Sequence, residues 1–249
     1  MLRQPGPHIY SVFTNRAGST STTWALGMAA GLAAKGKSVT LIDADMEGGT
    51  IRASLGLHKG RDASIANLMN TNMDVDILMR QTVGVEGYEN VRVIPGFADG
   101  NYGPELTRPL LTMEPALRQL PDDYVIIDCG HPLSHAAIGS PQDVFNAIGL
   151  VSEKLFFVAR DDPGYAQHAI GMFRHLHIDS GRWGEFNLVI CEQRKGRERD
   201  HIRQRFAQAL QVTPLAGWAW NERQAIKSLN QNRAYPMGDL PKRCGLLVD

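Results

Sequence analysis

The sequence predicts an α/β fold, in which a doubly wound and mostly parallel sheet of seven strands carries helices on both faces. Apolar, strand-like runs alternate with helical patterns along the chain, which is typical of βα units in a parallel sheet. Several of the strand-like runs are continuously β-branched or aromatic, as in strands that are covered on both faces. No linker or internal repeat interrupts the 249 residues, so we expect one domain over residues 1–249.

The expected elements alternate along the chain. Strands are expected at 8–14 (HIYSVFT), 38–43 (SVTLID), 91–95 (VRVIP), 124–128 (YVIID), 154–159 (KLFFVA), 186–191 (FNLVIC) and 213–219 (TPLAGWA). Helices are expected at 22–35, 63–80, 104–120, 134–149, 163–177, 197–210 and 222–231. The glycines of residues 79–93 indicate a connection into the third strand, and we expect residues 238–249 to form an irregular tail.

Composition excludes several classes of protein. Lysine plus arginine and aspartate plus glutamate number 26 each, which is unlike a strongly basic nucleic-acid binder. No apolar run approaches the roughly 20 residues that span a bilayer, and the N-terminus has no signal-peptide core. Cys129, Cys191 and Cys244 are far apart and show no metal or redox spacing. We therefore expect a cytoplasmic protein with no transmembrane segment.

A loop between the first strand and the first helix has the position of a phosphate-binding loop. Residues 16–24 read RAGSTSTTW and lead into a small-residue helix. Such a turn is an anion site, because free backbone N–H groups and the helix dipole point at one spot. The P-loop pattern G-x-x-x-x-G-K-[ST] would place Asn15 and Thr20 at its glycines and Ser21 at its lysine. Only Thr22 fits, as the hydroxyl that binds Mg²⁺.

Aspartates end two of the predicted strands at the same edge of the sheet. Asp43 and Asp45 lie at the end of SVTLID and just beyond it, one βαβ step after the loop, and Asp128 ends YVIID. Ligands of open α/β sheets bind at the carboxyl edge. Carboxylates near a phosphate loop are what a Mg²⁺–nucleotide site requires. The sequence therefore predicts that these three side chains converge on the loop.

Taken together, these motifs resemble those of the ParA/MinD group of deviant P-loop ATPases, which belong to the SIMIBI class of P-loop NTPase-like folds. That group shares the pattern K-G-G-x-G-K-[ST]-[ST], then L-I-D-x-D, then Y-D-x-V-I-I-D. The resemblance extends to LVSEKLFFVARDDPGYAQHAIGMFRHL and WNERQAIKSLNQNRAYPM, and so covers roughly residues 8–237.

The resemblance implies a role for each residue of the site. Arg16 takes the place of the signature lysine, which reaches the phosphates across a nucleotide-sandwich dimer, and Asp45 takes the place of the carboxylate that positions the attacking water. The implied nucleotide-binding residues are Arg16, Ala17, Gly18, Ser19, Thr20, Ser21, Thr22 and Thr23. The implied Mg²⁺ ligands are Thr22, Asp43 and Asp128.

Two departures from the family pattern predict a weak site. Ser21 replaces the P-loop lysine, and one charge-assisted contact to phosphate is worth about 1.5–3 kcal/mol. Thr20 replaces a glycine, and a β-branched residue is strained wherever the loop needs a positive φ. We expect the loop to be reshaped or partly closed. ATP and Mg²⁺ should bind weakly, with little or no hydrolysis, as in a pseudo-ATPase.

These losses resemble the atypical loop G-G-x-G-[small]-[ST]-[ST] of CpaE/TadZ-like proteins, which serve pilus assembly. The resemblance implies a MinD/CpaE-like positioning or scaffold protein that forms a homodimer. Its protein partners would belong to a polar, septal or secretion/pilus system, and it would be recruited to a pole, septum or membrane-associated complex. The main alternative is an active ParA-type partitioning ATPase that binds DNA non-specifically. A phosphotransferase or ligase-like enzyme on the same fold is a third possibility.

Two other features have ordinary explanations. The stretch RKGRERDHIRQR (194–205) has six basic and two acidic residues, and a solvated, ion-paired helix face is a commoner origin of such a pattern than DNA binding. We therefore expect no nucleic-acid partner. His168, His175 and His177 share a predicted helix but lack the acidic partner of an H-E-x-x-H motif, so they are predicted to be surface or partly buried side chains.

Overall fold

The computed structural model describes residues 6–16, 18, 20–45, 50–57, 63–68, 74–96, 107–131, 141–175, 185–192, 197–212 and 214–219. Its strands are β1 His8–Phe13, β2 Val39–Asp43, β3 Val83–Val85, β4 Tyr88–Ile94, β5 Tyr124–Asp128, β6 Lys154–Arg160, β7 Glu185–Glu192 and β8 Ala216–Ala219. Its helices are α1 Ser21–Ala34, α2 Thr50–Ser54, α3 Val75–Arg80, α4 Thr107–Leu117, α5 Pro141–Val151, α6 Pro163–His175 and α7 Arg197–Leu210, with a 3₁₀ helix, η1, at Ile65–Leu68.

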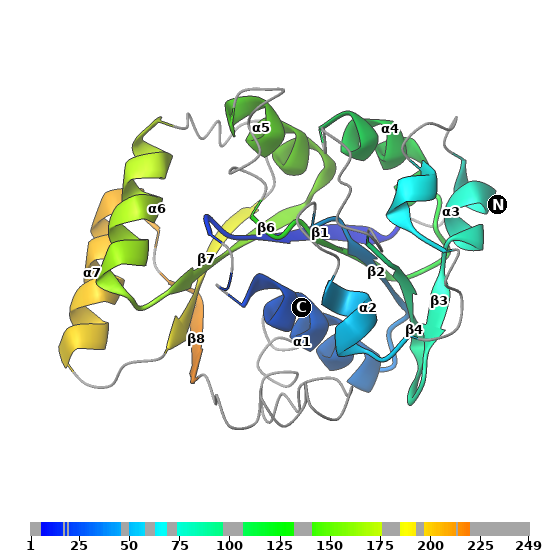
Figure 1. Ribbon diagram of the computed structural model, residues 1–249, viewed down its shortest axis with the longest axis horizontal. Helices are drawn as coiled ribbons and strands as arrows, with labels where there is room; N and C mark the ends of the chain where they lie inside the picture. Colours follow the sequence, from blue (N-terminus) through cyan, green and yellow to red (C-terminus); the bar gives the residue numbers. More distant parts are fainter. Residues whose placement is uncertain are drawn as a thin grey trace.

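The strands form one sheet in the order β3-β4-β2-β5-β1-β6-β7-β8, with helices on both of its faces (Figure 1). Seven of these strands pair in parallel, and β3 pairs antiparallel to β4 at one edge. The predicted doubly wound, mostly parallel fold is confirmed. The central strands are apolar throughout because helices cover them on both sides, and all five residues of β2 and of β5 are buried.

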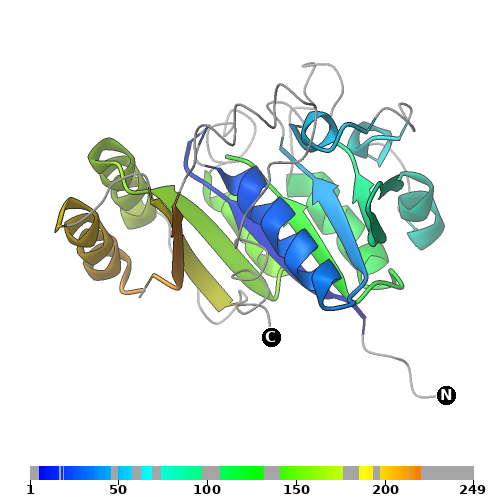
Figure 2. The same ribbon diagram turned by 90° about the horizontal axis from the view of Figure 1, so that it is seen from below.

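Each face of the sheet has its own hydrophobic core. α1 lies along one face, against β1, β2, β4 and β5 (Figure 2), and buries Trp24, Met28 and Leu32 there. Gly36 ends this helix: it has φ 77°, and its N–H bonds to the carbonyl of Ala33. The opposite core gathers side chains from α3 to α7. None of the described helices has the length and apolar character that crossing a bilayer requires.

The structure corrects several predicted elements. Residues 79–93 are not a plain connection, because they contain β3 and most of β4, joined by a tight turn at Gly87 with φ 80°. The predicted helix 63–80 is divided into η1 and α3, since the side chain of Asp74 caps a new helix by accepting from the N–H of Ile77 at 2.8 Å. The short α2 was not predicted. The predicted helix 222–231 and tail 238–249 lie outside the described residues.

Candidate functional site

The loop after β1 lies at the carboxyl edge of the sheet and leads directly into α1. Thr14 and Asn15 begin it and are buried, with 2% and 5% of their surface exposed. The N–H of Thr14 donates to the carbonyl of Gly130 at 2.8 Å. This bond ties the start of the loop to the segment that follows β5. Arg16 and Gly18 are exposed, while Ala17 and Ser19 lie outside the described residues.

Thr20 adopts a left-handed backbone conformation just before α1, with φ 68° and ψ 21°. This region favours glycine, and a β-branched residue in it is strained by about 1–2 kcal/mol. The side chain of Thr20 makes no capping hydrogen bond at the start of α1. The prediction of a strained threonine at a positive φ is confirmed. The expected reshaping of the loop stays a prediction, since Ala17 and Ser19 lie outside the described residues.

The first turn of α1 carries three hydroxyl side chains and no charge. Ser21 is buried, and Thr22 and Thr23 are half-buried. The first turn contains no acidic residue, so the positive end of the helix dipole is not compensated there. Ser21 supplies no cation where the P-loop lysine is expected. The turn can therefore attract an anion only through N–H groups, hydroxyls and the dipole.

Asp43 and Asp128 lie side by side, because β2 and β5 are paired with these two residues in register. Both are fully buried. The carboxylate of Asp43 accepts from the N–H groups of Asp45 and Ile51, at 3.3 and 3.1 Å. That of Asp128 accepts from the N–H of Gly130 at 3.2 Å.

One oxygen of Asp128 remains under-bonded in this cluster. Its Oδ2 is buried and has no hydrogen bond of standard length among the described residues, although the hydroxyl of Thr22 is close enough to favour the ionised carboxylate. Within the described segments, Thr14 Oγ1 and Asn15 Oδ1, both in the loop, are likewise buried without a hydrogen-bond partner. Buried polar atoms are normally satisfied, so this concentration of unsatisfied oxygens fits a ligand site.

Burial raises the pKa of Asp43 to about 7 and that of Asp128 to about 8. Repulsion from neighbouring carboxylates adds to both shifts: Asp45 acts on Asp43, and both Asp43 and Asp45 act on Asp128. Two adjacent buried carboxylates cannot both be ionised cheaply. Near neutral pH the pair is therefore at least partly protonated, and a divalent cation could replace its protons.

Asp45 is half-buried, and its carboxyl group lies against Gly130. A Cβ atom on Gly130 would come within 2.4 Å of the Asp45 Cγ, and Gly130 has φ 56°. Because Gly130 has no side chain, the Asp45 carboxyl group can occupy the space beside it. The sequence motif D-C-G after the fifth strand contained this signal, but the residue was not predicted as part of the site.

The structure thus brings Thr22, Asp43, Asp45 and Asp128 together, as predicted. Mg²⁺ is commonly held by one or two carboxylates together with water and phosphate oxygens. The described residues contain no group of three His, Cys, Asp or Glu side chains arranged to hold a metal ion by themselves. Thr22 and Asp128 fit such an ion, with Asp43 beside them.

Arg16 makes a different contact from the one expected of a residue that reaches across a dimer. Its guanidinium lies 5.1 Å from the ring centre of Tyr165, in the first turn of α6 of the same chain. Beside it, the amide Nδ2 of Asn15 lies 2.9 Å from Nδ1 of His168. Sequence reasoning did not assign Tyr165 or His168 to the site.

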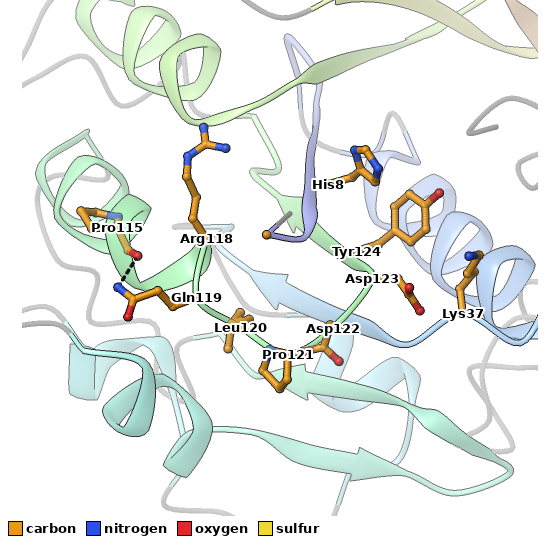
Figure 3. A pocket seen from close by; sticks show the side chains of 11 residues that line it. His8, Lys37, Pro115, Arg118, Gln119, Leu120, Pro121, Asp122, Asp123 and Tyr124 are labelled. Atoms are coloured by element: carbon orange, nitrogen blue, oxygen red, sulfur yellow. Dashed lines mark hydrogen bonds between the residues drawn. The ribbon is translucent and has the colours of Figure 1, made fainter. Parts of the chain in front are cut away.

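A separate pocket of about 790 Å³ lies at the opposite edge of the sheet, where β1 and β5 begin (Figure 3). His8, Tyr124 and Lys37 line one side of it, and Arg118 faces them. Asp123, at its rim, accepts hydrogen bonds from the N–H and hydroxyl of Ser38. The pocket is separated from the loop by the length of the strands, so it takes no part in the phosphate site.

A family model described as an AAA domain matches residues 8–140, which is more than half of the chain. The chain belongs to this AAA-domain family. No curated protein gives a significant match.

Solved structures extend the similarity of this AAA-domain protein over almost the whole chain. A ParA family ATPase from Chlorobium tepidum TLS is 14% identical, with a TM-score of 0.75 over 96% of each chain. The septum site-determining protein MinD from Pyrococcus horikoshii OT3, complexed with Mg-ADP, is 19% identical, with a TM-score of 0.71 over 98% of this chain and 96% of that one.

A chain of the MinC:MinD cell division protein complex from Aquifex aeolicus gives 13% identity and a TM-score of 0.69, over 97% of this chain and 95% of that one. These identities show a shared fold. The predicted fold of the ParA/MinD-type P-loop proteins is thereby confirmed.

The strain at Thr20 predicts that Thr20→Gly does not destabilise the protein. Relief of about 1–2 kcal/mol of backbone strain should match or exceed the roughly 0.5–1 kcal/mol that glycine costs through its freedom in the unfolded chain. Urea denaturation should therefore give an unchanged or higher free energy of unfolding. Ala30→Gly, in the interior of α1, is the control and should lose about 1 kcal/mol. An equal loss in both variants would contradict the assigned strain.

The raised pKa values of Asp43 and Asp128 predict a pH dependence of stability without metal. The folded protein binds more protons than the unfolded chain, whose aspartates titrate near 3.8. Proton binding to the two aspartates therefore stabilises the folded protein. This stabilisation is complete below pH 3.8 and is lost as the pH rises through about 7 and about 8.

The matched test compares Asp128→Asn with the wild type in urea denaturation with a chelator. The free energy of unfolding of Asp128→Asn, relative to that of the wild type, should rise by about 1 kcal/mol per pH unit between about pH 6 and about pH 8. The reason is that the substitution removes one titrating group from the pair. Asp123→Asn is the control: the pKa of Asp123 is lowered, chiefly by the N–H of Ser38, so its effect should be constant over this range. A constant effect of Asp128→Asn as well would show that the pair is not protonated.

Proposed function

We propose that this chain is a MinD/CpaE-like positioning or scaffold protein that binds ATP and Mg²⁺ weakly and acts as a dimer through protein partners. The observation that carries the proposal is Ser21, a buried and uncharged residue at the start of α1. The turn has the location and the threonines of a phosphate loop, but Ser21 supplies no cation at the position where a P-loop has its lysine.

The chemistry of the site supports weak nucleotide binding. N–H groups at the start of α1 would hold the phosphates, and Thr22 with Asp128 would hold Mg²⁺, which would neutralise phosphate charge. Asp45 would orient a water molecule. The missing contact at Ser21 lowers the binding free energy by about 1.5–3 kcal/mol, and it reduces transition-state stabilisation as well. We therefore propose a pseudo-ATPase with little or no hydrolysis.

The related structures support both a nucleotide and a protein partner. One MinD structure is complexed with Mg-ADP, and another MinD is in a complex with MinC. For this chain we propose a cytoplasmic protein that is recruited to a pole, septum or membrane-associated complex. The loop pattern AGSTSTT favours the CpaE/TadZ-like branch and partners of a secretion or pilus system.

An active partitioning ATPase that binds DNA is the alternative. Its support is the ParA family ATPase of similar fold and the basic stretch at the start of α7, where Arg197 is exposed. The net charge of the whole chain is zero, and Arg205 is partly engaged by Gln167 at 2.8 Å. Both observations favour the scaffold over a DNA-binding ATPase.

The nucleotide affinity tests the proposal directly. Calorimetry should show that Mg·ATP binds in the high-micromolar range or more weakly. The double variant Ser21→Lys with Thr20→Gly restores charge and removes strain, so it should bind about ten- to a hundredfold more tightly. Ser21→Ala is the control and should bind no better than the wild type. Low-micromolar binding by the wild type would sink the proposal.

The oligomeric state separates a scaffold from a nucleotide-driven switch. A protein that hardly binds ATP cannot depend on it for assembly, so we expect a dimer with and without Mg·ATP. Light scattering coupled to gel filtration measures this. A monomer that dimerises only when Mg·ATP is added would show that the switch is intact and that the protein is not a constitutive scaffold.

A further inference from the structure

Helix α6 contacts the phosphate loop through two side chains on one of its faces. Tyr165 and His168 are three residues apart, which places them on the same side of the helix. Tyr165 contacts Arg16 and His168 contacts Asn15, so two consecutive loop residues meet one helix. α6 lies with α7 beside the β6–β7 part of the sheet (Figure 1). It begins more than 140 residues after the phosphate loop in the sequence.

Tyr165 is the larger of the two contacts. The guanidinium groups of Arg16 and Arg160 lie 5.1 and 5.0 Å from the centre of its ring, within the range of cation–π attraction. Its hydroxyl is 4.0 Å from the point where a Cβ atom on Gly18 would lie, so the ring also borders the left-handed part of the loop.

The start of α6 is itself held in place. Asp162 Oδ1 accepts from the N–H groups of Gly164 and Tyr165, at 2.9 and 3.2 Å, in the manner of a helix cap. Ala166, Ala169 and Ile170 are buried in the core. Tyr165 and His168 are therefore carried on a fixed helix but are not core residues, since one is half-buried and the other exposed.

We propose that Tyr165 and His168 are positioning residues of the phosphate site, which hold the loop in its left-handed conformation in the absence of a phosphate ligand. A loop with Gly18 and Thr20 at positive φ, strained at Thr20, needs contacts that offset the strain. Bound phosphate commonly supplies these through backbone N–H groups. Here the ring of Tyr165 and the imidazole of His168 supply them from α6.

The contact with Tyr165 also holds the Arg16 side chain against its own chain. A guanidinium held over Tyr165 stays beside the loop, where it can meet a phosphate from the same site. This consequence rests on the proposed function, since it assumes a phosphate-binding loop. The proposal that α6 holds the loop does not rest on that function, because it concerns the protein without ligand.

Hydrogen exchange of the ligand-free protein tests the proposal. In Tyr165→Leu and in His168→Leu, the peptide that covers the loop should exchange about five- to tenfold faster, because each loses a contact of the strength of a cation–π interaction or a hydrogen bond. Tyr165→Phe keeps the ring and should exchange like the wild type. Gln167→Ala breaks the bond from α6 to Arg205 of α7 and is the control, with no change in the loop.

Unchanged loop exchange in both leucine variants would overturn the proposal. Faster exchange in every peptide, with a lower unfolding midpoint, would overturn it too, because the residues would then be merely structural.

A second readout uses the background Ser21→Lys, which restores the positive charge and keeps the strained Thr20. Adding Tyr165→Leu there should weaken Mg·ATP binding several-fold, and tighter binding would count against a positioning role. If that background fails to bind Mg·ATP, the proposed function fails, while the exchange result still decides the role of α6.

Discussion

The parallel pairing of β5 with its two neighbours is the constraint from which the candidate site follows. Asp128 is in register with Val12 of β1 on one side and with Asp43 of β2 on the other. Since the three strands run in the same direction, the loop after β1 and the aspartates of β2 and β5 leave the sheet at one edge. Cross-strand bonds continue beyond the sheet, from Thr14 to Gly130 and from Ala44 to Asp128. These bonds fix the distance between the loop and the carboxylates.

The carboxylates at this edge are balanced by their own protons. Asp43 and Asp128 are buried side by side, and the rise of both pKa values lets them hold protons near neutral pH. Ser21 adds no positive charge, and Arg16 lies over Tyr165. The protonated pair therefore needs no cation to balance it, which supports the proposed weak dependence on nucleotide.

Much of this arrangement could be predicted from the sequence, because it depends on local patterns. Buried parallel strands are long apolar runs, and Asp43 and Asp128 end two of them, so the fold and the carboxylates were visible. β3 was missed because three residues carry no periodicity. Tyr165 and His168 were missed for another reason. Their partners are about 150 residues away, and an aromatic or histidine on a helix looks the same whether it faces solvent or a loop.

We expect the loop to keep a strained, left-handed conformation at Thr20 without any phosphate bound. A high-resolution crystal structure of the protein, grown without nucleotide, phosphate or sulfate, tests this most directly. We expect Thr20 with φ near 68° and the ring of Tyr165 against the guanidinium of Arg16. Thr20 in a right-handed conformation, with α1 extended backward by a turn and Arg16 away from Tyr165, would contradict the claim.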